Sequence, residues 1–292
     1  MATTEMLQYL LSGITVGSIY GLVGIGFTGV YNVTGIVNFA QGDMAMFGSM
    51  LGIAMFELGV PIPLAILIAV VAMGLLAGVM ERWAIRPVGH DLLNAIIVTI
   101  GLGVIMQGVA VVLWGTDARA LPAFAGEKPL HFLGATLAPQ ALWVIGTAAL
   151  LVTALTAFFN YSYLGKAFIA CALNRFAANI CGIDVRRMST IAFVLSGSLG
   201  AIAGLVVSPI TFIQYDTGIP LSIKGFTACI IGGLGNPIGA MIGGILLGII
   251  EAMASGYLSS GFKNAIAFIL LLSVLLLRPA GLLGDLLSKT AR

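Results

Sequence analysis

Charge is the property that this sequence has least of. Only 8% of its 292 residues are Asp, Glu, Lys or Arg, against about 25% in ordinary soluble domains. The mean hydropathy of +1.11 likewise excludes a water-facing surface over most of the chain. The net charge of +2 is too small for a nucleic-acid-binding surface, so nucleic acid is not expected as a partner.

Reactive side chains are equally scarce. The three cysteines, Cys171, Cys181 and Cys229, have no spacing typical of zinc or redox sites and are expected to be small apolar packing residues. No serine-hydrolase or zinc-protease motif is present. The Gly165-Lys166 pair lacks the glycine spacing and the Ser/Thr of a phosphate-binding P-loop. We therefore expect no catalytic residue, metal or cofactor on this chain.

Long apolar runs take the place of these motifs. Most are close to the roughly 20 residues that a helix needs to cross a bilayer, and the first is expected to be a retained span rather than a signal peptide. A further run, 222–234, ends at a Gly-rich stretch and is short, which predicts a broken or re-entrant helix. The sequence thus predicts an all-α polytopic transmembrane bundle, one domain over 1–292, with about eight full spans. These are residues 7–30, 43–58, 62–82, 93–114, 139–159, 187–210, 238–257 and 262–278.

The basic residues predict an orientation. Two polar segments, 115–138 and 160–187, interrupt the apolar runs, and cytoplasmic loops are enriched in Lys and Arg. Placing 160–187 in the cytoplasm and 115–138 in the periplasm puts nine basic residues inside and four outside, with the N-terminus outside and the C-terminus inside. Termini on opposite sides require an odd number of membrane crossings. Because the eight full spans are an even number, the short segment 222–234 would have to be the ninth crossing. The inner nine are Arg82, Arg86, Lys166, Arg175, Arg186, Arg187, Arg278, Lys289 and Arg292, and the outer four are Arg119, Lys128, Lys224 and Lys263.

Polar groups inside apolar runs are costly, and they are functional candidates for that reason. The stretches 38–43 and 232–239 combine polar side chains with irregular backbone, as transporter sites do. Each charged candidate also has a structural interpretation. Asp43 fits the positive N-terminus of the following helix. Glu251 fits either a position close to the outer membrane interface or a pair with Lys263 or Asn264. The candidate translocation-path residues are Asn38, Gln41, Asp43, Gly233, Gly235, Asn236 and Glu251.

Two further patterns concern helix packing and the polar segment. Small residues repeat along two predicted spans, at Gly197, Gly200 and Gly204 and at Gly243, Gly244 and Gly248, which favours close helix contacts. Residues 166–181 predict one short helix ending at a Gly182 C-cap. This helix fits either an interfacial position or a docking site for a cytoplasmic partner. Its apolar stripe is Ile169, Leu173, Ala177 and Ile180.

Four stretches in a fixed order resemble the branched-chain amino-acid ABC transporter permeases. The first is Asn38-Phe39-Ala40-Gln41-Gly42-Asp43 after a Gly-rich span. The second is residues 172–185, with 192–204 following. The third runs from Lys224-Gly225-Phe226 through the Gly-rich 232–244, and the fourth is residues 277–284. The resemblance covers about residues 8 to 285.

This resemblance implies a subunit of a bacterial inner-membrane importer for branched-chain amino acids. Such a permease lies in membrane lipid beside a second homologous permease. Two P-loop ATPase subunits bind ATP and Mg beneath it, and a periplasmic solute-binding protein delivers the solute. Residues 166–184 would form the coupling-helix loop that contacts the ATPase. The coupling residues would be Ala172, Asn174, Arg175, Ala178, Gly182 and Ile183.

Three alternatives remain open at this point. The same family also fits another small solute, such as a short amide, urea or an aromatic acid. A secondary transporter or channel without ATPase partners would predict charged relays inside the spans, and these are sparse. An intramembrane enzyme would predict converging reactive groups, which the sequence does not provide.

Overall fold

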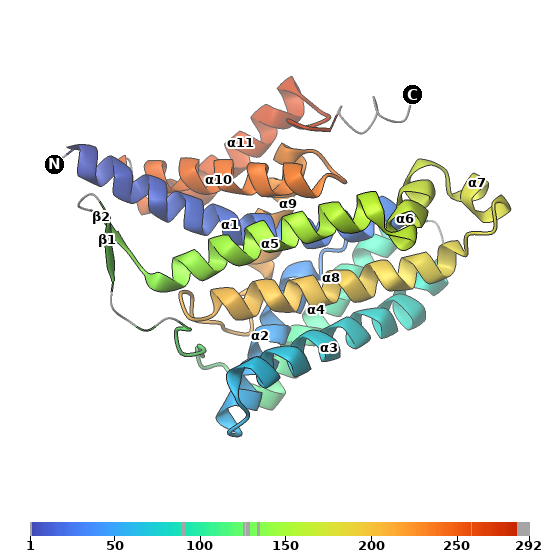
Figure 1. The fold of residues 1–292 in the computed structure, drawn as a ribbon, viewed down its shortest axis with the longest axis horizontal. Helices are drawn as coiled ribbons and strands as arrows, with labels where there is room; N and C mark the ends of the chain where they lie inside the picture. The colour runs from blue at the N-terminus through green and yellow to red at the C-terminus, as the bar shows by residue number, and fades with distance from the viewer. Residues whose placement is uncertain are drawn as a thin grey trace.

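The computed structural model describes residues 2–284 except 89, 90, 125, 127, 128, 133, 134 and 258. Three basic residues of the orientation argument, Lys128, Lys289 and Arg292, lie outside the described residues. The described chain is almost entirely helical (Figure 1). The α-helices are α1 (Ala2–Thr34), α2 (Gln41–Glu57), α3 (Ile62–Met80), α4 (Leu92–Trp114), α5 (Pro139–Tyr161), α6 (Tyr163–Leu173), α7 (Arg175–Ile180), α8 (Val185–Val207), α9 (Gly218–Gly232), α10 (Pro237–Tyr257) and α11 (Lys263–Leu277). The short elements are η1 (Glu81–Ile85), η2 (Arg86–Val88), η3 (Ser260–Phe262) and the hairpin of β1 (Leu130–Phe132) and β2 (Ala135–Leu137).

Six described helices are long and apolar enough to cross a membrane, which confirms an all-α, multi-pass bundle. They are α1, α3 with its continuation to Val88, α4, α5, α8 and α10. The predicted count of about eight full spans is not confirmed, because α2 has 17 residues and α11 has 15. Helix α9 also has 15 residues, a rise of about 22 Å against a hydrocarbon core of about 30 Å.

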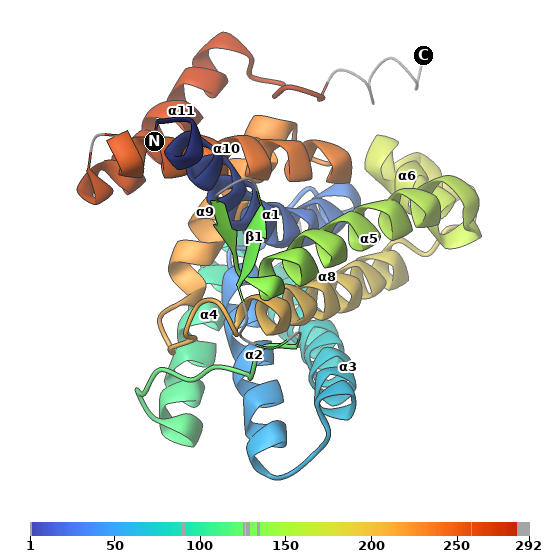
Figure 2. The same ribbon diagram turned by 60° about the vertical axis from the view of Figure 1, so that its left-hand side comes forward.

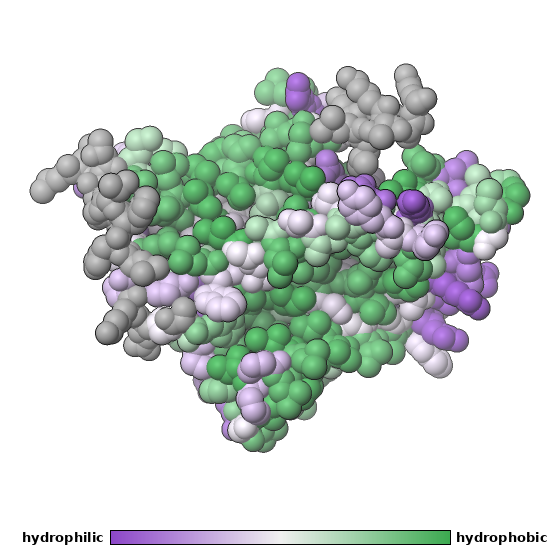
Figure 3. All heavy atoms as spheres, in the orientation of Figure 1, coloured by the Kyte–Doolittle hydropathy of each residue, from purple (hydrophilic) through white to green (hydrophobic). Residues whose placement is uncertain are grey.

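The bundle has two ends of different character. The N-terminus of α1 lies at one end beside the β1–β2 hairpin, where the Gln8 side chain exchanges hydrogen bonds with the Thr136 backbone (Figure 1). We call this the hairpin end. Helices α6 and α7 lie at the opposite end, which we call the α7 end. Apolar side chains cover the flank between the two ends, and hydrophilic ones gather near the α7 end (Figure 3).

Helices α1–α4 and α8–α11 repeat one arrangement in opposite directions. In this repeat α1 corresponds to α8, α2 to α9 and α3 to α10. The contact of α1 with α10 then corresponds to that of α8 with α3, and the contact of α2 with α8 to that of α9 with α1. Figure 2 shows α2, α3 and α4 on one side of α1 and α8, with α10 and α11 on the other. The segments before α2 and α9 share a short motif, with Thr34-Gly35-Ile36 matching Thr217-Gly218-Ile219. Inverted repeats of this kind place transporter sites beside discontinuous helices.

Glycines close the main contacts between helices. A Cβ atom at Gly248 of α10 would collide with the α1 backbone at Gly13 and Gly17. On α8, a Cβ at Gly204 would collide with the α2 backbone at Ala45. These contacts confirm the prediction that small faces let the helices approach closely.

The prediction of one helix over 166–181 is wrong, because the chain breaks at Asn174 between α6 and α7. Asn174 has an extended backbone (φ −159°, ψ 107°), and its side-chain oxygen accepts a hydrogen bond from Ala177 N at 3.0 Å, so it caps α7. This side-chain cap offers the backbone an alternative to a continuous helix, and the chain adopts it. Gly182 does end α7, with φ at +84°, as predicted. The predicted apolar stripe faces outward, and α6 instead buries Gly165, Phe168 and Cys171.

Candidate functional site

The stretch 38–43 turns back into the bundle after α1. Gly35, with φ at +63°, ends the helix, and Asn38 and Gln41 are completely buried. The Gln41 side chain donates to Ser196 O at 3.0 Å and accepts from the Ser196 hydroxyl, which fastens this stretch to α8. Asn38 accepts from Ala40 N at 3.2 Å and so shapes the turn into α2. These residues line up the start of α2 in the interior of the bundle.

Asp43 lies in the first turn of α2, as its structural interpretation predicts. Asp43 is 4% exposed, and Gln107 of α4 donates to its Oδ1 atom at 2.8 Å. Gly103 and Gly218 leave room for it, because a Cβ at either position would collide with the carboxylate. The positive end of α2 also favours a negative group here.

The start of α9 docks on the same stretch. Ser222 accepts from Gly42 N at 2.8 Å and donates to Phe39 O at 2.8 Å. The N-terminal turns of α2 and α9 therefore meet beside Asp43. Two half-helices with their N-termini at one buried polar site are an arrangement found in transporters, where those ends face anionic groups of the solute.

The structure separates the other predicted path residues from this group. Gly233, Gly235 and Asn236 follow the far end of α9, where Gly233 packs against Ala280 and Gly284. Asn236 caps α10 by accepting from Ile238 N at 3.0 Å. These residues therefore hold the turn between α9 and α10, and α9 separates them from Asp43.

Glu251 forms a third group and is completely buried. Tyr20 donates to its Oε2 at 2.8 Å and Lys224 donates to the same oxygen at 3.0 Å. Lys224 also donates to the Tyr20 oxygen at 3.0 Å, and Lys263 lies 3.8 Å from Oε2. Pairing with Lys263 was predicted, whereas Lys224 and Tyr20 were missed. The available signal was Lys224 itself, a cation inside a short apolar run that needs a buried partner.

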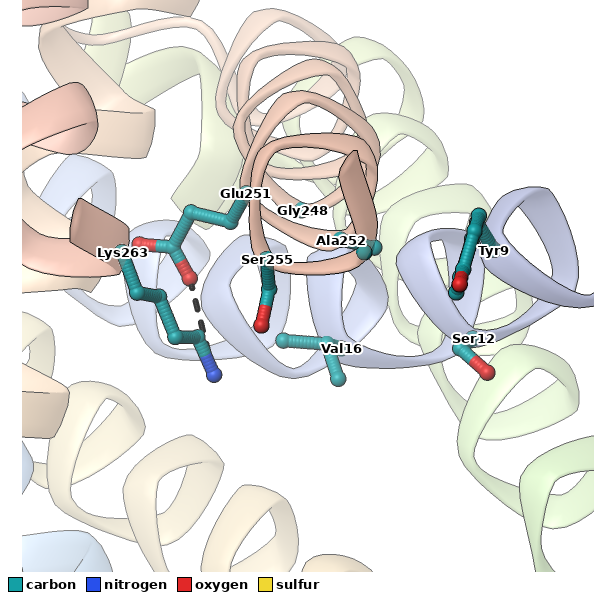
Figure 4. A pocket seen from close by; sticks show the side chains of 9 residues that line it. Tyr9, Ser12, Val16, Gly248, Glu251, Ala252, Ser255 and Lys263 are labelled. Carbon is teal, nitrogen blue, oxygen red and sulfur yellow. Dashed lines mark ion pairs between the residues drawn. The ribbon is translucent and has the colours of Figure 1, made fainter. Parts of the chain in front are cut away.

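Two cavities flank this group. The larger, about 440 Å³, opens at the surface of the chain and is shown in Figure 4. The smaller, about 150 Å³, is bordered by Lys224 and by Asn264. The Lys224–Glu251 ion pair thus lies between them. The larger cavity is lined by Tyr9, Ser12, Val16, Gly248, Glu251, Ala252, Ser255, Gly256 and Lys263.

The predicted coupling residues all lie at the α7 end, but they differ in exposure. Ala172, Asn174 and Gly182 are exposed, whereas Ala178 is buried. Arg175 turns inward, and its Nη2 atom lies 3.6 Å from where a Cβ at Gly35 would be. Burial lowers the pKa of Arg175, and the nearby Cys171 opposes this effect. The largest exposed apolar side chains of α7 are Phe176 and Ile180, neither of which was predicted as a coupling residue.

An all-α bundle with two discontinuous helices meeting at a buried polar site defines a membrane transport subunit. The family described as the branched-chain amino acid transport system permease component matches residues 9–276, and the chain belongs to this family. The permease protein LivH of the high-affinity branched-chain amino acid transport system of Escherichia coli (strain K12) is 35% identical over 95% of each chain. The corresponding protein BraD of Pseudomonas aeruginosa is 33% identical over 95% of each. PsaBC from Streptococcus pneumoniae in complex with Fab shares the fold, with a TM-score of 0.51 over 97% of this chain and 94% of that chain at 15% identity.

Proposed function

We propose that this chain is the membrane-spanning permease subunit of an ATP-driven importer that carries branched-chain amino acids across the bacterial inner membrane. The observation that carries the proposal is the 35% identity to the Escherichia coli permease over 95% of both chains. The chain performs no catalysis. ATP and Mg bind to two P-loop ATPase partners, a second homologous permease completes the pathway, and a periplasmic solute-binding protein delivers the solute.

Coupling to the ATPase takes place at the α7 end. The exposed apolar side chains of Phe176 and Ile180 supply a docking surface beside the six coupling residues. Helix α6 packs on α1, and the Arg175 guanidinium lies close to Gly35, which directly follows α1. A displacement of α7 therefore reaches the turn that leads into Asn38 and Asp43. Differential contacts of the ATPase with two positions of α7 would drive the switch.

The α7 end faces the cytoplasm in this proposal. Extended residues 35–40 and α2 together make one crossing, the loop 208–217 and α9 make another, and α11 makes the last. With the remaining six helices this gives nine crossings, an odd number, so the N-terminus is outside and the C-terminus inside. The basic residues of the α7 end, among them Arg86, Arg186 and Arg187, support this orientation.

Labelling of a cysteine already present in the chain tests the orientation. Cys181 is exposed at the α7 end, whereas Cys171 and Cys229 are buried. Burial also raises the pKa of the Cys171 thiol, which leaves less of the reactive thiolate at neutral pH. A membrane-impermeant maleimide should label the protein in inside-out vesicles but not in spheroplasts, and Cys181→Ser should abolish the labelling. Equal labelling of spheroplasts would contradict the orientation.

The function itself is tested by recovering the partners. The tagged chain is co-expressed with its chromosomal neighbours, extracted in mild detergent, and identified with its companions by mass spectrometry. We expect a P-loop ATPase and a second permease, and ATP-dependent uptake of L-leucine after reconstitution with the binding protein. Competition by short amides, urea or aromatic acids would instead identify another solute. Recovery of the chain alone, moving solute without ATP, would refute the importer.

A further inference from the structure

The larger cavity at Glu251 has the chemistry of a ligand site. It opens between α1, α10 and the start of α11, near the hairpin end. Figure 4 shows Glu251 and Lys263 on one side of the opening, with Ser255 and Val16 beside it. The cavity thus offers one anionic group, one cationic group, hydroxyl groups and an apolar wall. Its volume of about 440 Å³ lies in the range of small-molecule sites, about 300–1,000 Å³.

The two oxygens of the buried Glu251 carboxylate differ in their hydrogen-bond partners. Oε2 of Glu251 accepts from Tyr20 and Lys224, but among the described residues none donates a hydrogen bond to Oε1. Lys224 Nζ also lies 3.0 Å from Oε1, close enough for an ion pair but not aligned for a hydrogen bond. Glu251 also lines the larger cavity, so a cationic donor that enters the cavity can add a charge-assisted contact to this carboxylate.

The cationic group is available as well. Lys263 is 41% exposed, and its ammonium lies 3.8 Å from Glu251, too far for a hydrogen bond. The Lys263 ammonium can therefore bind an anionic group of a ligand while it stays close to the Glu251 carboxylate. Ser12, Ser255 and Tyr9 place hydroxyl groups on the same cavity, and Val16 and Ala252 supply its apolar surface.

We propose that this cavity binds a zwitterionic aliphatic α-amino acid on its way through the permease. The α-ammonium binds beside the Glu251 carboxylate, the α-carboxylate pairs with Lys263 and the neighbouring hydroxyl groups, and the aliphatic side chain lies against Val16 and Ala252. The proposal rests on the proposed function and adds a solute site to it. The smaller cavity beyond the Lys224–Glu251 pair continues the path of the solute. Lys224, which borders it, is the next cation that the α-carboxylate of the solute can pair with.

The test measures L-leucine binding to the complete ATP-free transporter in nanodiscs, without binding protein, by saturation-transfer NMR. We expect saturable binding that Lys263→Gln weakens by about tenfold, the loss of one exposed charge contact of about 1.4 kcal/mol. Ser255→Phe fills the cavity while keeping both charges and should abolish binding. Arg82→Gln removes an exposed cation at the α7 end and is the matched control, with unchanged binding.

Two analogues probe the two charges. L-Leucinamide lacks the carboxylate that pairs with Lys263, so it should compete with leucine equally weakly in the wild type and in Lys263→Gln. 4-Methylpentanoate lacks the ammonium, so it should compete with leucine poorly in both proteins. Unchanged leucine affinity in Lys263→Gln and Ser255→Phe would overturn the site. So would absence of leucine binding in a preparation that takes up leucine once binding protein and ATP are added. A preparation that takes up no leucine under those conditions would refute the proposed function, and the site with it.

Discussion

Replacement of Glu251 by leucine is expected to cause the largest loss of stability of any single substitution in the polar groups described. The Lys224 side chain is 14% exposed and the Glu251 side chain is completely buried. Removing the carboxylate leaves the Lys224 ammonium without its partner inside the bundle. Breaking a buried pair in this way costs about 3–5 kcal/mol. The thermal unfolding of the detergent-solubilised complex, followed by intrinsic fluorescence, should shift to clearly lower temperature.

The matched variant is Lys224→Met combined with Glu251→Leu. It removes both charges and keeps similar side-chain volumes, so most of the lost stability should return, because an apolar pair can replace a buried ion pair at little cost. Tyr20→Phe keeps both charges but removes two hydrogen bonds, one to Glu251 and one from Lys224, and should cost about 2 kcal/mol. If the double variant is as unstable as Glu251→Leu alone, the instability comes from packing of α10 against α1 and not from the unpaired lysine.

The sequence was sufficient to predict features that depend on neighbouring residues. The apolar runs predicted the bundle, the Gly-rich stretches predicted the close contacts of α10 and α8, and Gly182 predicted the end of α7. Asp43 was expected at a helix N-terminus and lies in the first turn of α2. Each of these features is set by local chain geometry or by the spacing of one residue type.

Features that join distant parts of the chain were not predictable in the same way. Tyr20, Lys224 and Glu251 lie on α1, α9 and α10, and only the packing of these three helices brings their side chains together. The predicted span 43–58 corresponds to α2, which has 17 residues and begins inside the bundle after the extended backbone that follows α1. The break at Asn174 depends on one side-chain cap within an otherwise helical pattern. The inverted repeat was missed because it is a relation between the contacts of distant helices, marked in the sequence by a Thr-Gly-Ile motif in each half.

Replacing Gly182 with valine and Ile183 with aspartate is expected to stop uptake while ATP hydrolysis continues. Gly182 has φ at +84°, where a β-branched residue is strained. Ile183 N donates to Ala178 O at 3.0 Å, and its side chain packs against the core. Both changes therefore displace α7 from the bundle without touching Asp43 or Glu251. In proteoliposomes with ATPase and binding protein, leucine uptake should fall at least about tenfold, equivalent to about 1.4 kcal/mol or more of lost coupling.

Gly59→Val is the matched control for this variant. Gly59 has φ at +86°, and a Cβ there meets nothing within 4 Å, as at Gly182, so the backbone strain is equal. It lies in the turn between α2 and α3, at the hairpin end and away from the ATPase side. Its uptake and ATP hydrolysis should fall together, in proportion to any loss of folded protein, so that the ratio of solute moved to ATP hydrolysed stays constant. Normal uptake by the Gly182 and Ile183 variant, or an equal fall of that ratio in Gly59→Val, would show that α7 does not transmit the motion of the ATPase.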